Sequence, residues 1–229
     1  MNGRYGGPRP AAGKLELVVG GSLWVQWGER RTLLGSTRMA QRLICVDDPS
    51  QVNEETMPLV LAMPRRELYR VQGYQTQVDF KVIESIADEQ WFAEPRALAE
   101  DLEAKEVRLG LLIRIDDRYL LSEHGDLVHV LRVPAAVVEL GEGLRALRTY
   151  ARLAAGRLLD RSCREPVLRG YVNDDGLAEL RPCFVLIYAV AVPEATQAPA
   201  GCSWVPSAAL AQVPMTPLSS LVLAGEAPA

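Results

Sequence analysis

The chain has 229 residues, of which 48% are hydrophobic and 24% are charged, the composition of an ordinary globular protein. The formal net charge of -4 gives no signal for nucleic-acid binding, because the field of the whole molecule does not attract a polyanion. No apolar run is long enough to cross a membrane, and residues 1–13 lack the apolar segment of a signal peptide. The four cysteines form no CxxC pair and no metal-ligand spacing, so we expect reduced thiols in a cytoplasmic protein.

The N-terminal part of the sequence predicts a β-rich extension. Two short apolar runs flank Gly20 and Gly21, a pattern that is typical of a β-hairpin. Trp24 and Trp27 lie on the second run, where we expect them to share one face and to cover a core or an interface. The polar stretch 47–56 is the predicted linker to the next domain.

The rest of the chain predicts an α/β (α+β) domain over residues 57–229, following an extension over residues 1–56. The expected strands cover residues 58–64, 107–115, 118–124, 127–133, 135–140, 167–172 and 183–192, with a short strand before Ser207. The expected helices cover residues 79–88, 95–106, 143–159, 207–212, where Ser207 is the predicted N-cap, and 216–225. This order predicts a mixed sheet sandwiched between helices. The connection through helix 143–159 joins either parallel strands or separate parts of the sheet.

The helix over residues 143–159 is amphipathic and contains no acidic residue. Its apolar stripe consists of Leu144, Leu147, Ala151, Ala154 and Leu158. A neighbouring stripe is basic and consists of Arg145, Arg148 and Arg152. The simplest interpretation is a packing helix with a solvated basic edge. Because guanidinium groups also suit phosphate oxygens, a site for a phosphate group on this edge is the alternative.

The segments around this helix resemble the Nudix hydrolases, whose motif is G-x5-E-x7-R-E-U-x-E-E-x-G-U, where U is a bulky aliphatic residue. The segments are "VLAMPRREL", "VQGYQT", "WFAEPRALAEDLEAKE", "VRLGLLIRIDDRYLL", "LRGYVNDDG", "CFVLIYAVAV", "CSWVPSAAL" and "PLSSLVL". Their order is similar to that in a set of bacterial and phage Nudix-like proteins that are often labelled phosphoesterase. The resemblance implies a Nudix-type α/β/α sandwich and a ligand that contains a phosphate linked to a nucleoside or a similar group.

The sequence departs from the Nudix pattern where those enzymes hold Mg²⁺. Glu142 falls on the first glutamate of the motif, but the Arg-Glu pair falls on Tyr150-Ala151 and the Glu-Glu pair falls on Ala154-Ala155. Because Mg²⁺ requires hard oxygen ligands, this degenerate motif predicts no bound metal, no cofactor and no metal-dependent hydrolysis. We therefore expect a protein that binds a nucleotide-like small molecule or a partner.

The candidate ligand-binding residues are Arg145, Arg148 and Arg152 on the helix and Asn173, Asp174 and Asp175 in the sequence "NDDG". That sequence is also a turn signature, which is the simpler interpretation of it. In one alternative the chain is a divergent Mg²⁺-dependent pyrophosphohydrolase, whose catalytic and metal-binding carboxylates would come from Glu139 and Glu142, with Asp174 or Asp175. In another it is a structural or phage-related assembly protein that uses Trp24 and Trp27 as an interface. Whether the chain is an enzyme, and whether it forms a homodimer, stays open at this point.

Overall fold

A computed structural model describes residues 14–18, 22–27, 30–36, 59–135, 137, 144–194 and 196–226. The chain divides into two compact units, Met1–Gln51 and Val52–Ala229.

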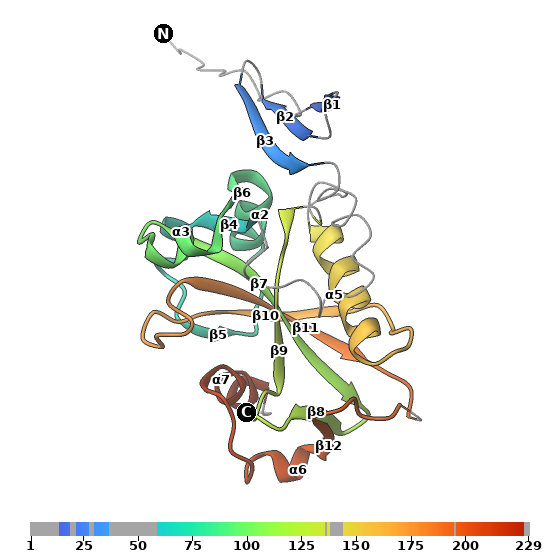
Figure 1. The fold of residues 1–229 in the computed structure, drawn as a ribbon. Coiled ribbons are helices and arrows are strands. Elements are labelled where there is room, and N and C mark those ends of the chain that lie inside the picture. Colours follow the sequence, from blue (N-terminus) through green and yellow to red (C-terminus); the bar gives the residue numbers. More distant parts are fainter. Residues whose placement is uncertain are drawn as a thin grey trace. The chain divides into compact units, whose positions relative to one another are not determined.

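The described part of the first unit is a three-stranded antiparallel sheet of β1 (Lys14–Val18), β2 (Ser22–Trp27) and β3 (Arg30–Ser36), in that order (Figure 1). The pairing of β1 with β2 confirms the predicted hairpin, whereas β3 was not predicted. The expected placement of Trp24 and Trp27 on one face concerns side chains that lie outside what the structure describes.

The second unit is built on a nine-stranded mixed sheet, whose main path runs β12-β8-β7-β11-β10-β5. Its strands are β4 (Val60–Pro64), β5 (Gly73–Gln75), β6 (Trp91–Ala93), β7 (Ala104–Ile115), β8 (Arg118–Ser122), β9 (Val128–Arg132), β10 (Val167–Asn173), β11 (Cys183–Ala191) and β12 (Cys202–Pro206). β7 and β11 are parallel and central, whereas β4, β8 and β9 pair with β7 in the antiparallel sense. The apolar segment at 183–192 is predicted as a strand, and the structure places it at the centre of the sheet.

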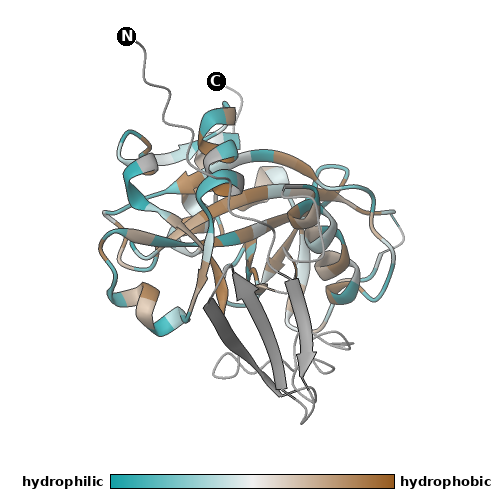
Figure 2. Ribbon diagram, turned by 90° about the horizontal axis from the view of Figure 1, so that it is seen from above, coloured by the Kyte–Doolittle hydropathy of each residue, from teal (hydrophilic) through white to brown (hydrophobic). Residues whose placement is uncertain are grey.

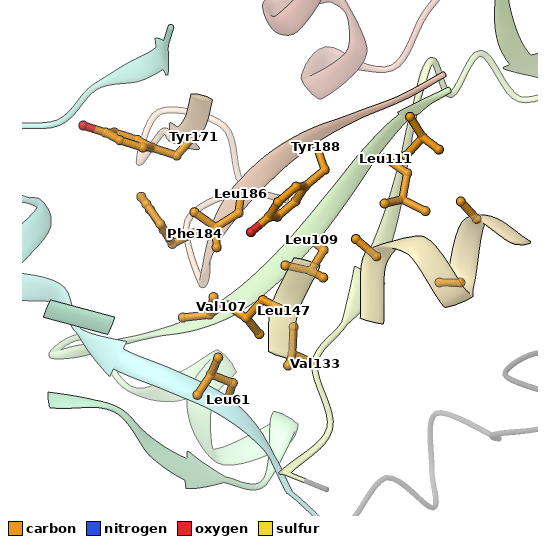
Figure 3. Packing of buried hydrophobic residues seen from close by; sticks show 14 of the residues in the cluster. Leu61, Val107, Leu109, Leu111, Val133, Leu147, Tyr171, Phe184, Leu186 and Tyr188 are labelled. Carbon is orange, nitrogen blue, oxygen red and sulfur yellow. The ribbon is translucent and has the colours of Figure 1, made fainter. Parts of the chain in front are cut away.

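Helices cover both faces of this sheet. They are η3 (Arg65–Leu68), α2 (Phe80–Glu89), α3 (Pro95–Glu100), α5 (Leu144–Leu158), α6 (Ser207–Leu210) and α7 (Pro217–Glu226). On one face, Ile83 and Ile86 of α2 and Leu147 of α5 join a core with inward-facing residues of β7 and β11 (Figure 3). On the other face, Leu218 and Val222 of α7 join a second core. Figure 2 shows apolar strands between helices that also carry polar residues. The fold is thus an α/β/α sandwich around a mixed sheet, as predicted.

The predicted helix 95–106 is too long, because its last residues belong to the sheet. α3 ends at Glu100, and β7 begins at Ala104. Lys105 and Glu106 are buried in the sheet, at 0% and 2% exposure, and both carry ion pairs. Burial in a central strand has overridden a helical pattern, since tertiary contacts outweigh the weak preferences of individual residues.

The secondary structure before α5 differs from the prediction, and the strand after α5 shows what the connection through this helix joins. Ala135 and Val137, predicted in a strand over 135–140, are helical, and the Val137 amide donates to the Pro134 carbonyl at 3.0 Å, which turns the chain out of the sheet. Beyond α5 the chain returns as β10, which pairs with β11 and β5, whereas β9 pairs with β7. The connection therefore joins separate parts of the sheet.

Ser207 is the first residue of α6 rather than its N-cap. The N-cap is Pro206, which makes no side-chain capping hydrogen bond. The Ser207 amide instead donates to the Asp117 carbonyl at 2.8 Å, which fixes the start of α6 to the turn between β7 and β8. Pro217 is the first residue of α7, in line with the preference of proline for the first helical position.

Candidate functional site

Helix α5 packs on the sheet through its small residues. Its bounds, Leu144–Leu158, confirm the helix predicted over 143–159. Leu147 and Ala151 are buried, in line with the predicted apolar stripe. Leu158, however, is 36% exposed, and Leu159 is buried in its place. The apolar stripe therefore turns by one residue at the C-terminal end of the helix.

The buried face of α5 includes the residues that fall on glutamate positions when Glu142 is aligned with the first glutamate of the Nudix motif. Ala151, Ala154 and Ala155, which fall on the carboxylate positions, are 0%, 5% and 0% exposed. The aliphatic position of the same alignment falls on Arg152, whose side chain is 43% exposed. Carboxylates at the three alanine positions would lie inside the apolar core, where an unpaired charge is very costly.

The burial pattern favours an alignment shifted by one residue toward the N-terminus. The aliphatic position then falls on buried Ala151, and the glycine of the motif falls on Gly156. The final aliphatic position falls on exposed Arg157, which still departs from the motif. The glutamate positions of this alignment on the helix are Tyr150, Leu153 and Ala154, and the first glutamate of the motif falls on Gly141 in place of Glu142. In either alignment, α5 presents no carboxylate between Leu144 and Leu158.

The basic edge of α5 is partly neutralised by a residue that the sequence analysis missed. The Arg148 Nε lies 3.0 Å from Glu165 Oε1, and the Arg152 Nε lies 3.6 Å from Glu165 Oε2. Each of these three side chains is about half exposed. Glu165 lies in the loop that returns from α5 to β10. An acidic residue in the return loop beside a basic helix edge is the signal that could have identified it.

Arg145 and Arg148 line a groove between the first half of α5 and the start of β10. The groove has a volume of about 440 Å³ and is completed by Glu165, Pro166, Val167, Leu168 and Tyr188. Burial raises the pKa of Tyr188 to about 12, although nearby Arg148 opposes this shift. The phenol therefore remains protonated at neutral pH and can donate a hydrogen bond.

The "NDDG" residues have their contacts elsewhere, at the end of β10. Asn173 Oδ1 accepts from Lys105 Nζ, and Asn173 Nδ2 donates to the Val71 carbonyl at 2.7 Å. Asp175 Oδ1 lies 2.7 Å from Lys105 Nζ and 2.8 Å from a terminal nitrogen of Arg65. Burial would raise the pKa of Asp175, but the hydrogen bonds and charges of Lys105 and Arg65 outweigh it and lower the pKa.

Asp174 makes the contacts of a turn residue. Its Oδ1 accepts from Gln72 Nε2 and from the Gly176 amide, both at 2.8 Å. The structure therefore joins Asn173, Asp174 and Asp175 to β7 and to the loop before β5 rather than to the arginines of α5. Glu139 and Glu142 lie outside the described residues. Among the residues that are described, no group of three or more His, Cys, Asp or Glu is placed to hold a metal ion.

Comparison with known proteins supports the fold and goes no further. A solved structure described as "Tm1382, a putative Nudix hydrolase" superposes with a TM-score of 0.62 at 16% identity, covering 73% of this chain and 97% of that one. A "putative oxidoreductase (SMa0793) from Sinorhizobium meliloti 1021" gives a TM-score of only 0.38 at 16% identity, covering 58% of this chain and 43% of that chain, too weak to indicate a shared fold. No family model and no curated protein matches the sequence. No helix in the described part of the chain is long and apolar enough to span a membrane.

Proposed function

We propose that this protein binds a phosphate-containing, nucleotide-like ligand in the groove beside α5, without metal-dependent hydrolysis. The observation that carries the proposal is the chemistry of α5. A helix on this face of a Nudix-like fold has arginines on its accessible edge and alanines on its buried face, and none of its residues 144–158 is acidic. Such a helix favours an anion and disfavours a divalent cation.

The arginines can bind phosphate while Glu165 remains nearby. Both ion pairs to Glu165 are formed through Nε. A guanidinium group has five N–H donors in a planar fork, so each arginine has donors beyond the one used in its ion pair. In the unliganded protein Glu165 holds Arg148 and Arg152 in place. A bound phosphate shares or displaces that carboxylate.

The opposite wall of the groove suits the ring system of a nucleotide-like molecule. Pro166, Val167 and Leu168 supply apolar surface, and Val167 is 59% exposed. A planar apolar group covering Val167 would remove that surface from water. Apolar contact at one end and charge-assisted hydrogen bonds at the other fix the orientation of such a ligand.

Titration calorimetry with ADP in the presence of EDTA tests this site. We expect Arg148→Ala to weaken binding by roughly 10- to 100-fold, on the scale of a lost charge-assisted hydrogen bond. Arg157→Ala is the matched control, because it removes the same charge from the last turn of the same helix, away from the groove lining. Equal losses of ADP affinity in both variants would mean that only the net positive charge of the helix matters, and would contradict a binding site at Arg148.

The substitution Glu165→Gln makes the opposite prediction. It keeps the shape of the side chain but removes the charge that competes with phosphate for Arg148 and Arg152. We expect ADP to bind several-fold more tightly to this variant, and the salt dependence of binding to become steeper. Unchanged or weaker binding would mean that these arginines do not contact the ligand.

A further inference from the structure

A second groove lies on the same side of the sheet, between β5 and the start of α2. It is open to solvent and has a volume of about 650 Å³, within the range of sites for small organic ligands. Its lining comes from the end of η3, β5, the first turn of α2 and β10. The lining residues used below are Arg66, Tyr69, Arg70, Asp79, Lys81 and Tyr171.

The charges around this groove are unbalanced in favour of cations. Arg66 forms an ion pair with Glu89. The Asp79 carboxylate is engaged in capping α2, since it accepts from the Lys81 amide at 2.9 Å. Within the part of the chain that the structure describes, the side chains of Arg70 and Lys81 form no ion pair with a carboxylate. Two positive charges therefore face the groove without a fixed partner.

Exposed aromatic rings accompany these cations. Tyr69 is 67% exposed and lines the groove, and Phe80, at the start of α2, is 70% exposed. Among the side chains described by the structure, these are the large aromatic groups that are exposed to this degree. Phe80 lies outside the lining of the groove, so Tyr69 is the exposed ring beside Arg70 and Lys81. A ring next to cations is the combination that binds unstacked bases.

Strand β10 connects this groove with the groove beside α5. The register of β10 with β11 shifts between Leu168 and Gly170, so that Leu168 pairs with Tyr188 and Tyr171 pairs with Leu186. Leu186 and Tyr188 are two positions apart in β11 and share a face, which Figure 3 shows for their side chains and for Tyr171. The bulge therefore brings Leu168 and Tyr171 to one face, although their sequence separation alone would place them on opposite faces.

We infer that the groove between β5 and α2 is a second binding site, for a nucleoside phosphate. Arg70 and Lys81 bind the phosphate, and Tyr69 stacks on the base. The same chemistry is offered by a free mononucleotide and by one unit of a single-stranded oligonucleotide. The net charge of -4 does not oppose this local site, because beyond a Debye length of about 8 Å charges are largely screened at physiological salt.

Binding of two probes tests the site and separates its two sources. The probes are AMP, followed by calorimetry, and a fluorescein-labelled oligo(dA) of eight nucleotides, followed by anisotropy. Both are used in EDTA, and AMP is titrated into protein that carries Arg148→Ala, so that the groove beside α5 does not contribute to its binding. We expect the double substitution Arg70→Ala/Lys81→Ala to weaken binding at least tenfold. We expect Tyr69→Ala to weaken it several-fold and Tyr69→Phe to restore it. Binding of AMP alone assigns a mononucleotide, and tighter binding of the oligonucleotide assigns a nucleic-acid strand.

The matched control is Arg96→Ala/Arg157→Ala, which removes two exposed positive charges outside the groove lining. Arg148→Ala separates this site from the groove beside α5, because it should leave oligonucleotide binding at the Tyr69 site unchanged. The inference is overturned if neither probe binds at 1 mM, roughly the weakest affinity of interest. It is also overturned if the control variant loses as much affinity as the double substitution, or if Tyr69→Ala has no effect.

Discussion

Lys105 is a buried charge whose hydrogen bonds join three strands. Its side chain is fully buried, and Nζ donates to Asn173 Oδ1, to Asp175 Oδ1 at 2.7 Å and to the Cys183 carbonyl at 3.4 Å. The group joins β7 to β10 and β11. We expect Lys105→Met to lower the free energy of unfolding by about 1–3 kcal/mol, because buried Asn173 Oδ1 loses its donor. Urea denaturation measures this effect, and exposed Lys81→Met should change the free energy of unfolding little.

His129 predicts a pH dependence of stability. Burial lowers its pKa below the usual value near 6.5, against a backbone hydrogen bond with Leu120 and the charge of Asp126. Its Nε2 is buried and lacks a hydrogen-bond partner among the described residues. As the pH falls through the unfolded-state pKa, the unfolded chain takes up a proton that the folded protein resists, so stability is lost.

The melting temperature should therefore fall between pH 7.5 and pH 5.5, and His129→Gln should reduce that slope. His124, whose side chain is 80% exposed, provides the control, and His124→Gln should leave the slope unchanged. An identical slope in wild type and His129→Gln would show that another group controls stability in this range.

At the scale of single residues, the sequence predicts which side chains are polar, but it does not predict which residues they contact. The turn at "NDDG" is predictable from its composition, and Asp174 does accept the local hydrogen bonds of a turn. The partners of Asp175 are Lys105 and Arg65, which are 70 and 110 positions away in the sequence. Glu165 lies in the loop directly after α5, which is a sequence signal, but its pairing with Arg148 and Arg152 is seen only in the folded chain.

Helix α5 is the element on which the functional account depends. Its periodicity predicts the helix and most of its buried face, because apolar residues at helical spacing must face a core. The exact register against the sheet required the burial of Ala151 and Ala155. The second half of the helix predicted at 95–106 was wrong. Lys105 and Glu106 are typical of the exposed face of a helix, yet they are buried in the central strand β7.

Placing a carboxylate on α5 tests the burial argument. Ala155 is fully buried, so Ala155→Glu should lower the free energy of unfolding by about 3 kcal/mol or more, the scale of an uncompensated buried charge. Leu153 is 48% exposed, and Leu153→Glu should cost less than about 1 kcal/mol. Chemical denaturation of the two variants gives the comparison. Similar stabilities would mean that Ala155 does not face a packed core.

For the whole molecule, the order of elements was sufficient to predict a mixed sheet between two layers of helices. The apolar run at 183–192 predicts the strand that the structure places at the centre of the sheet. The ligand could not be predicted in this way. Both grooves combine residues that are distant in the sequence, such as Arg148 with Tyr188 and Lys81 with Tyr171. Gly170 in β10 is a sequence signal for a bulge, but it does not show which residues the bulge brings to one face.

The central claim is that the groove beside α5 binds a phosphate group without metal-dependent hydrolysis. The most direct test measures the binding of ADP and its conversion to product in parallel, once with EDTA and once with Mg²⁺ or Mn²⁺. We predict equal affinity under the two conditions, dependence of that affinity on Arg148, and no product. Turnover that requires Mg²⁺ or Mn²⁺ and disappears in Glu142→Gln would contradict the claim and establish a metal-dependent hydrolase.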